Sequence, residues 1–199
     1  MNRRILSAGL IATALSASCG TEQLPQDVFL ERLGQHCSQA FAGRIIANEP
    51  AQADDPFAGK PLIMHVRECS ATEIEVPFHV GDDRSRTWVL TRTATGLRLK
   101  HDHRHEDGSE DAVTMYGGDT AAAGSAHRQA FPVDAYSIAM FEREGLSAST
   151  SNTWTMEIEP ARRFLYELSR PSGRLFQVEF DLSRPVAAPP PPWGHGEPH

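Results

Sequence analysis

From Leu62 onward, apolar and polar residues alternate one by one in a series of short segments. The alternation runs through residues 62–66, 73–80, 86–93, 97–105, 113–116, 136–141, 154–158, 164–168 and 176–182. Because successive side chains of a strand point to opposite faces, this period is typical of half-buried strands. Many short strands in series predict a mainly β fold, an antiparallel meander closed as a calycin-like barrel or folded as a sandwich.

A helical pattern precedes the strands. Pro25 suits the first turn of a helix, and apolar residues then recur at a period of about 3.6 residues at Val28, Phe29, Leu33, Cys37 and Phe41. We therefore expect one N-terminal helix that starts at Pro25, ends at Gly43 and caps the barrel.

The chain begins in the manner of an exported protein. Arg3 and Arg4 supply positive charge, residues 5–15 form a short apolar core, and small residues precede Cys19. The core is too short for a membrane-spanning helix, which takes about 20 apolar residues. We expect a signal peptide at 1–18, a tether at 19–24, one β-rich domain at 25–184 and a proline-rich tail at 185–199.

Two processing routes fit this segment. The small residues before Cys19 resemble a bacterial lipobox, which would make Cys19 lipidated and the first residue of the mature chain. Ser16 stands where that pattern prefers leucine, and ordinary cleavage after Ala17 or Ser18 fits the small-residue rule as well. Both routes predict export, and lipidation of Cys19 adds attachment to the membrane of the cell envelope.

Cys37 and Cys69 remain once Cys19 is assigned to processing. An even pair of cysteines in an oxidising compartment is expected to form a disulfide, and two buried free thiols are the alternative. Closing a loop of about 30 residues would contribute roughly 3 to 4 kcal/mol to the free energy of unfolding.

The charge balance is acidic. Lys and Arg number 19 against 26 Asp and Glu, and without Arg3 and Arg4 the balance is 17 against 26, a formal charge of −9. An acidic surface argues against nucleic acid and anionic lipid as partners. Arg86 and Arg92 share the inward parity of Trp88 and could face an anionic ligand, although strand ends also commonly carry arginine.

The segment 97–105 ends in a row of histidines. Leu97 and Leu99 share parity with His101, His103 and His105, so an unbroken strand would turn all three imidazoles into the core. Two histidines at i and i+2 on a strand can coordinate one metal ion, and Glu110 follows closely enough in sequence to complete the set of ligands. These four residues are candidate ligands for a divalent transition metal such as zinc.

Two other interpretations of the row remain open. The strand could end or bulge near His101 and place His103 and His105 in a hydrated loop, or the imidazoles could form an inward polar network. A buried imidazole without a partner costs about 1 to 3 kcal/mol, so inward histidines need partners. His65 and His79 have outward parity, and we expect them to be solvated.

Three segments resemble a family of bacterial exported proteins and lipoproteins of uncharacterised activity. They are LKHDHRHEDG at 99–108, YGG at 116–118, and FDL at 180–182 followed by PPWG at 191–194. No activity comes with this resemblance. A shorter stretch, His103, His105 and Glu110 before Gly117, is similar to the first metal motif of the cupins, which implies that these three residues bind a metal. The second cupin motif is missing.

The sequence leaves two functions from different classes. The first is a non-enzymatic envelope protein, a small barrel that binds a small molecule or another envelope component. The second is a metal-dependent enzyme in which the histidine row holds an ion that activates water. The direction in which the histidines point discriminates between them.

Overall fold

The computed structural model of the protein describes residues 23–51 and 55–196. Its elements are α1 (Pro25–Gly34), β1 (Gln39–Glu49), β2 (Leu62–Val66), β3 (Glu68–Cys69), β4 (Glu73–Val80), β5 (Asp83–Arg92), β6 (Leu97–His103), β7 (Tyr116–Asp119), β8 (Arg128–Pro132), α2 (Ala135–Arg143), the 3-10 helix η1 (Ser147–Ser151), β9 (Thr153–Glu159), β10 (Arg163–Ser169) and β11 (Leu175–Val186). The expected signal peptide and Cys19 lie outside the described residues. The helices of these residues lack the length and the apolar run that a membrane-spanning helix requires.

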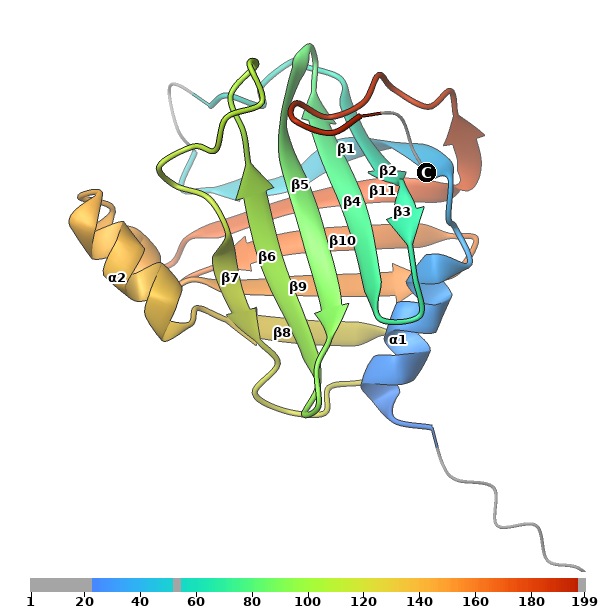
Figure 1. The fold of residues 1–199 in the computed structure, drawn as a ribbon, viewed down its shortest axis with the longest axis horizontal. Helices are drawn as coiled ribbons and strands as arrows, with labels where there is room; N and C mark the ends of the chain where they lie inside the picture. The colour runs from blue at the N-terminus through green and yellow to red at the C-terminus, as the bar shows by residue number, and fades with distance from the viewer. Residues whose placement is uncertain (1–22, 52–54, 197–199) are drawn as a thin grey trace, which may run out of the picture.

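All strands belong to one antiparallel sheet that is nearly closed as a barrel, in the order β7-β6-β5-β4-β2-β1-β11-β10-β9-β8, with β3 paired to β4. The strands follow one another as in the expected meander, and the first and last strands pair with each other. In Figure 1, β4 to β7 form the near wall, and β8 to β11 cross behind them. The mainly β barrel fold is thus confirmed.

The barrel closes where β7 meets the end of β8. The Asp134 N–H donates to the Gly117 carbonyl at 2.9 Å, and the Gly117 N–H donates to the Ser137 hydroxyl at 2.8 Å. A Cβ on Gly118 would lie 1.8 Å from the Pro132 carbonyl oxygen, so only glycine permits this approach. The two edges are therefore joined by backbone contact and by the start of α2.

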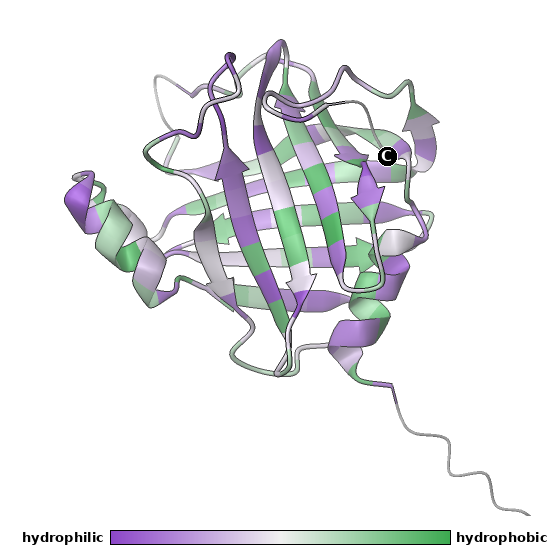
Figure 2. Cartoon of the chain, viewed as in Figure 1, coloured by the Kyte–Doolittle hydropathy of each residue, from purple (hydrophilic) through white to green (hydrophobic). Residues whose placement is uncertain are grey.

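Alternating side chains fill one half of the barrel. The strands change between apolar and polar along their length in Figure 2, and the inward set, including Leu90, Leu97 and Leu99, is inaccessible to solvent. Helix α1 lies across one end and buries Phe29 and Leu33 completely. Each such side chain contributes roughly 1.5 to 3 kcal/mol by burial, so α1 is held as a plug by its apolar face.

Helix α1 is shorter than expected. It ends at Gly34, and Gly43 instead lies within β1. Ser38 adopts a left-handed backbone conformation (φ 66°) and its N–H donates to the Val66 carbonyl at 2.6 Å, which turns the chain into the sheet. Phe41 therefore reaches the core from a strand and not from the helix, so the helix predicted beyond Gly34 is wrong.

The segment 136–141, expected as a strand, is helix α2. Its start is capped by Asp134, whose carboxylate accepts the Ser137 N–H at 2.8 Å, and its end has Gly145 in the left-handed region (φ 73°). The Leu146 N–H returns to the Phe141 carbonyl, which completes a Schellman motif. Asp134 and Gly145 are sequence signals of a helix start and a helix end, and the strand prediction from alternation overlooked them. Strand β7 begins only at Tyr116, and β1, β3 and β8 have no counterpart in the sequence prediction.

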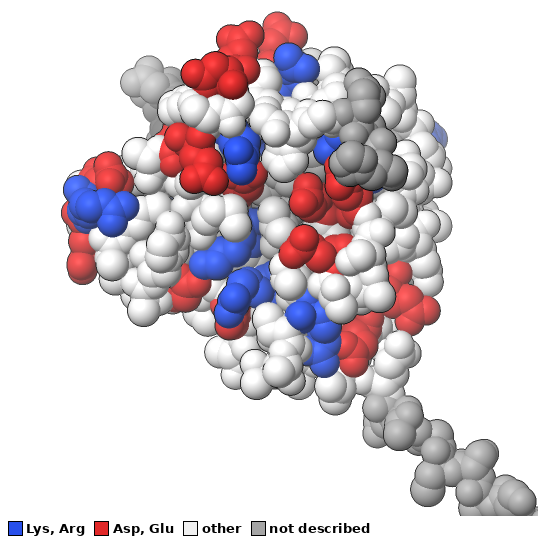
Figure 3. Space-filling model, viewed as in Figure 1, with Lys and Arg blue, Asp and Glu red and all other residues white. Residues whose placement is uncertain are grey.

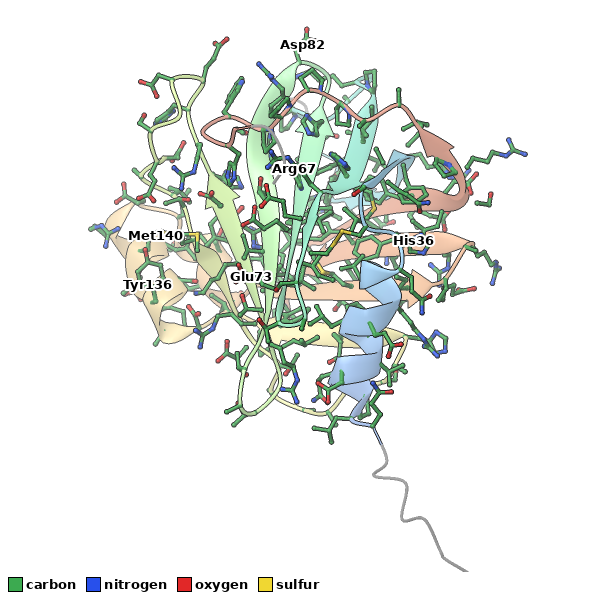
Figure 4. All side chains as sticks on the ribbon, turned by 45° about the vertical axis from the view of Figure 1, so that its right-hand side comes forward. His36, Arg67, Glu73, Asp82, Tyr136 and Met140 are labelled. Atoms are coloured by element: carbon green, nitrogen blue, oxygen red, sulfur yellow. A yellow bond between two sulfur atoms is a disulfide. The ribbon has the colours of Figure 1, made fainter. Side chains whose placement is uncertain are left out.

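The Cys37–Cys69 disulfide is confirmed. The two Cα atoms are 6.2 Å apart, and the bond lies just beyond the end of α1 in Figure 4. It joins the segment after α1 to β3 and thereby ties the plug to the wall of the barrel.

The C-terminal tail packs on the barrel. Strand β11 continues through Pro185 and Val186, which pair with β1. The chain then crosses the outer face of the near wall (Figure 1), where the Trp193 N–H donates to the Arg84 carbonyl at 3.0 Å and the Arg84 guanidinium donates to the Pro191 carbonyl at 3.1 Å. Arg67 also donates to the Gly196 carbonyl.

This tail changes the environment of two histidines. His65 and His79 have the outward parity that the sequence predicts, but both are buried and not solvated. The tail covers this face, and His79 lines a crevice together with Pro190 and Trp193. Burial lowers the pKa of His79 to about 4, with the charges of His65 and Arg84 acting in the same direction.

Candidate ligand cavity

The half of the barrel away from α1 contains a cavity of about 250 Å³. Arg92 at one end of β5 pairs with Asp27 of α1, whereas Arg86 at the opposite end lines the cavity. The wall is mainly aromatic: Phe57, Phe78, Trp88, Tyr116, Phe141, Trp154, Tyr166 and Phe176. Strand parity placed both arginines on the inward side of β5. Arg86 lines the cavity there, whereas Arg92 contacts helix α1.

Stacked aromatic rings bound the cavity on the side that faces α1. Trp88 on β5 and Tyr166 on β10 stack across the interior with ring centroids 4.5 Å apart, and Phe78 stacks on the Trp88 ring at 5.0 Å. Strands β5 and β10 are not neighbours in the sheet, so this stack bridges opposite walls. It separates the cavity from the packed core next to α1.

His101 lines the cavity, and both of its ring nitrogens have hydrogen-bond partners. Nδ1 lies 3.1 Å from the Tyr116 carbonyl oxygen and Nε2 lies 2.9 Å from the Tyr166 hydroxyl. A carbonyl only accepts, so Nδ1 carries the proton and Nε2 accepts from Tyr166. Burial, followed by the charge of His103, lowers the pKa of His101 to about 3, so the ring is neutral at pH 7.

His103 also faces inward and pairs with a tyrosine. Its Nε2 lies 3.1 Å from the Tyr116 hydroxyl. Burial, with the nearby Arg86 charge, lowers the pKa of His103 to about 4, and burial raises the pKa of Tyr116 to about 12. Both partners are uncharged at neutral pH, so the histidines and tyrosines form an inward polar network of neutral groups.

The remaining candidate metal ligands lie elsewhere. Strand β6 ends at His103, and the chain turns through residues 105–108, which leaves His105 exposed. Glu110 is also exposed, with a carboxylate oxygen 3.5 Å from the Arg104 guanidinium. Among residues 23–51 and 55–196, no three His, Cys, Asp or Glu side chains group as metal ligands do. His101 and His103 therefore come together, but His105 and Glu110 do not join them, either as the histidine row or as the cupin-like set.

Arginines supply the charge at the mouth of the cavity. Arg86 donates to the Asp83 carboxylate at 2.5 Å, which balances its charge. Arg170 donates to the Asn152 amide oxygen at 2.5 Å and to the Ser149 hydroxyl at 3.2 Å, and Arg174 donates to the Asn48 amide oxygen at 2.6 Å. In the part of the chain that the structure describes, neither Arg170 nor Arg174 has a carboxylate within 4 Å.

The cavity is consequently electropositive inside an acidic protein. The described residues that line it include no Asp or Glu. Burial and the charge of Arg174 lower the pKa of the Arg170 guanidinium, so two like charges are held close together in a partly buried place. Such a concave site concentrates its field on anything that enters.

Arg170 and Arg174 were not singled out in the sequence, although a signal for them exists. Phe164, Tyr166 and Leu168 are the inward residues of β10, and continuing the same parity past the end of the strand reaches Arg170. The inward parity of β11, read backwards from Phe176, reaches Arg174. In β10 and β11, the two-residue period therefore also identifies the inward-facing residue just outside the strand.

The outer surface has a different character. Basic and acidic side chains are interspersed over the near wall in Figure 3. Ion pairs outside the cavity include Arg98 with Asp119 and Lys100 with Asp134.

Comparison with protein families, with curated proteins and with solved structures finds no match to this chain.

Proposed function

We propose that this protein is a non-enzymatic binding protein that holds a compact aromatic or apolar small molecule inside its barrel. The observation that carries the proposal is the aromatic cavity with a small number of fixed polar groups in its wall. Ligand sites in proteins commonly combine apolar walls with a few polar groups that set orientation.

The size of the cavity limits the ligand. A cavity of about 150 Å³ holds benzene, and ligand pockets commonly span about 300 to 1,000 Å³. At about 250 Å³, the cavity suits one substituted ring or two fused rings. The Trp88 and Tyr166 rings offer flat faces for such a molecule, and aromatic pairs contribute about 0.5 to 1.5 kcal/mol beyond the burial of area.

The histidines fit a binding role. His101 donates through Nδ1 to the Tyr116 backbone carbonyl and accepts through Nε2 from the Tyr166 hydroxyl, and His103 contacts the Tyr116 hydroxyl. The contacts to the two hydroxyls hold the tyrosine rings in place before a ligand arrives. Preorganised walls raise affinity because less conformational freedom is lost on binding.

Calorimetric titration with naphthylmethanol, a neutral two-ring probe, tests the proposal. We expect binding at one site per chain, and we expect Leu168→Trp, which fills the cavity, to abolish it. Ile46→Trp adds the same side chain at an exposed position on β1 and should leave the affinity unchanged. Equal binding by wild type and Leu168→Trp, or no binding by wild type, would contradict the proposal.

We also propose that the protein is exported and anchored in the cell envelope through a lipid on Cys19. The signal-like segment before Cys19 supports export and lipidation. Without Arg3 and Arg4 the chain has a formal net charge of −9, which gives no attraction to anionic membranes, so attachment would depend on the lipid. Membrane fractionation of Cys19→Ala against wild type tests the anchor. Release of the variant into the soluble fraction is expected, and a soluble wild-type protein would contradict it.

A further inference from the structure

We propose that the ligand of this cavity is an aromatic carboxylate, with its anionic group held by Arg170 and Arg174 and its ring in the aromatic part of the cavity. This inference rests on the proposed function and specifies the chemical class of the ligand. It follows from the placement and the charge of the two arginines and from the aromatic rings beside Arg174 and Arg86.

The placement comes from one hairpin. Arg170 follows β10 and Arg174 precedes β11, and the Arg170 N–H donates to the Arg174 carbonyl at 3.0 Å across the turn. Both side chains therefore leave the same end of the barrel on its inward side, and both line the cavity. The hairpin fixes their relative position before a ligand binds.

Among the described residues, each of the two guanidiniums has N–H groups that donate no hydrogen bond. Arg170 uses Nε and Nη2 toward Asn152 and Ser149, and Arg174 uses Nη1 toward Asn48 and nearby carbonyls. Within residues 23–51 and 55–196, Nη1 of Arg170 and Nη2 of Arg174 donate no hydrogen bond. A guanidinium offers five N–H donors in a fork that matches the two oxygens of a carboxylate.

The charge arrangement favours an anion between them. Arg86, the third arginine at the mouth, has Asp83 as its partner, but the neighbouring pair has only neutral amide, hydroxyl and carbonyl partners in the described structure. Two like charges in a partly buried site repel each other, and an anion bound between them would offset that repulsion by attracting both guanidiniums. The neutral His101 and His103 add no competing charge.

The aromatic contacts join the charged zone to the apolar zone. The Arg174 guanidinium carbon lies 5.6 Å from the centroid of Phe176, and that of Arg86 lies 5.6 Å from the centroid of Phe57. Both rings also belong to the cavity wall, with centroids 4.8 Å apart. A molecule whose carboxylate is attached directly to its ring would span both zones without a long linker.

Calorimetric titrations with naphthoate, naphthamide and naphthylmethylammonium test the inference, since these probes share the ring and differ in charge. We expect naphthoate to bind at least about tenfold more tightly than naphthamide, because hydrogen bonds to charged groups are the stronger ones. The ammonium probe should bind most weakly. Raising the salt concentration should weaken only the binding of naphthoate.

Arg170→Gln and Arg174→Gln should each weaken naphthoate binding about tenfold and leave naphthamide binding unchanged. Arg98→Gln, on the outer face of β6, removes an equal charge away from the cavity and should change neither affinity. Thermal unfolding identifies any variant that fails to fold. If Arg170→Gln does so, Arg174→Gln and the salt dependence decide the question.

The outcomes separate the two proposals. Equal binding of naphthoate and naphthamide to wild type would overturn the carboxylate assignment and leave the binding function standing. Tighter binding of naphthyl phosphate or naphthalene sulfonate than of naphthoate would also overturn the assignment. Failure of every two-ring probe to bind would contradict the proposed function itself.

Discussion

The imidazole Nε2 of His195, in the C-terminal tail, lies 3.2 Å from the Asp102 carboxylate on β6. Asp102 also accepts hydrogen bonds from Arg104 at 2.9 Å and from Thr114 at 3.2 Å, and its side chain is almost completely buried. Burial raises the pKa of this carboxyl, but the bonds from His195, Arg104 and Thr114 outweigh it and lower the pKa to about 2. The tail therefore contacts a charged group that is firmly ionised.

This contact lies directly behind the cavity wall. Asp102 is the residue between His101 and His103, and strand parity turns it outward where they turn inward. The tail covers the outer face of the strand whose inner face carries both histidines. The position of β6 is thus set from both sides.

Removing the tail contact should destabilise the fold. We expect His195→Ala to lower the free energy of unfolding by roughly 1 to 2 kcal/mol, because a hydrogen bond to a charged, buried group is lost. In a double-mutant cycle with Asp102→Asn, the coupling energy should be roughly 1 kcal/mol. Urea unfolding at pH 7 measures both, and additive effects would show that the two side chains do not interact.

His105→Ala provides the control for this cycle. His105 is exposed in the turn after β6, so its removal should change the free energy of unfolding by no more than about 0.5 kcal/mol.

The buried histidines should make the fold sensitive to acid. The pKa of His101 is lowered to about 3 and that of His79 to about 4, both chiefly by burial. Below pH 6.5 these histidines therefore bind protons in the unfolded chain while they stay neutral in the folded chain. The free energy of unfolding should therefore fall as the pH decreases from about 6.5 to about 4, by roughly 1.4 kcal/mol per pH unit for each histidine. Urea unfolding at several pH values measures the slope.

His79→Gln should remove about one histidine's share of that slope. Asp102 acts in a lower window, because its lowered pKa gives stability that is present above about 3.9 and lost as the pH falls through about 2. A free energy of unfolding that stays constant between pH 6.5 and pH 4.5 would contradict the prediction for both histidines.

The disulfide should contribute substantially to stability. Cys37 and Cys69 are 32 residues apart, and in the chain-entropy picture a loop of this length is worth roughly 3 to 4 kcal/mol. We expect the double variant Cys37→Ser with Cys69→Ser to lose about this amount in urea unfolding. Peptide mapping of unreduced protein should recover the two cysteines in one linked fragment, and recovery as separate peptides would contradict the bond.

Closure of the barrel should depend on Gly118. Alanine there would place a Cβ 1.8 Å from the Pro132 carbonyl oxygen, so the β7 and β8 edges would have to separate. We expect Gly118→Ala to lower the free energy of unfolding by roughly 1 to 3 kcal/mol, as overpacking does. Gly196→Ala, with open space at its Cβ, should stay within about 0.5 kcal/mol, and equal effects of the two variants would contradict the role of Gly118.

Local periodicity was sufficient for most of the sheet. The alternation around Phe78, Trp88, Leu99 and Phe180 marked four strands and their inward sides, because the two-residue period is a property of the chain itself. The same reasoning failed at 136–141, where the residues alternate by chance and Asp134 and Gly145 cap a helix. Alternation alone cannot separate a short strand from a short helix whose caps are overlooked.

Parity assigns each side chain to one face of its strand, and with it His101 and Arg86 to the inside of the barrel. It carries no information about what lies opposite, since that depends on how the sheet closes. Only the closed barrel brings Trp88 onto Tyr166 and places Arg170 and Arg174 at the mouth of the same cavity. The burial of His79 likewise depends on a tail more than a hundred residues away in sequence. Such contacts are long-range, and their energy comes from excluding water between surfaces that no local pattern pairs.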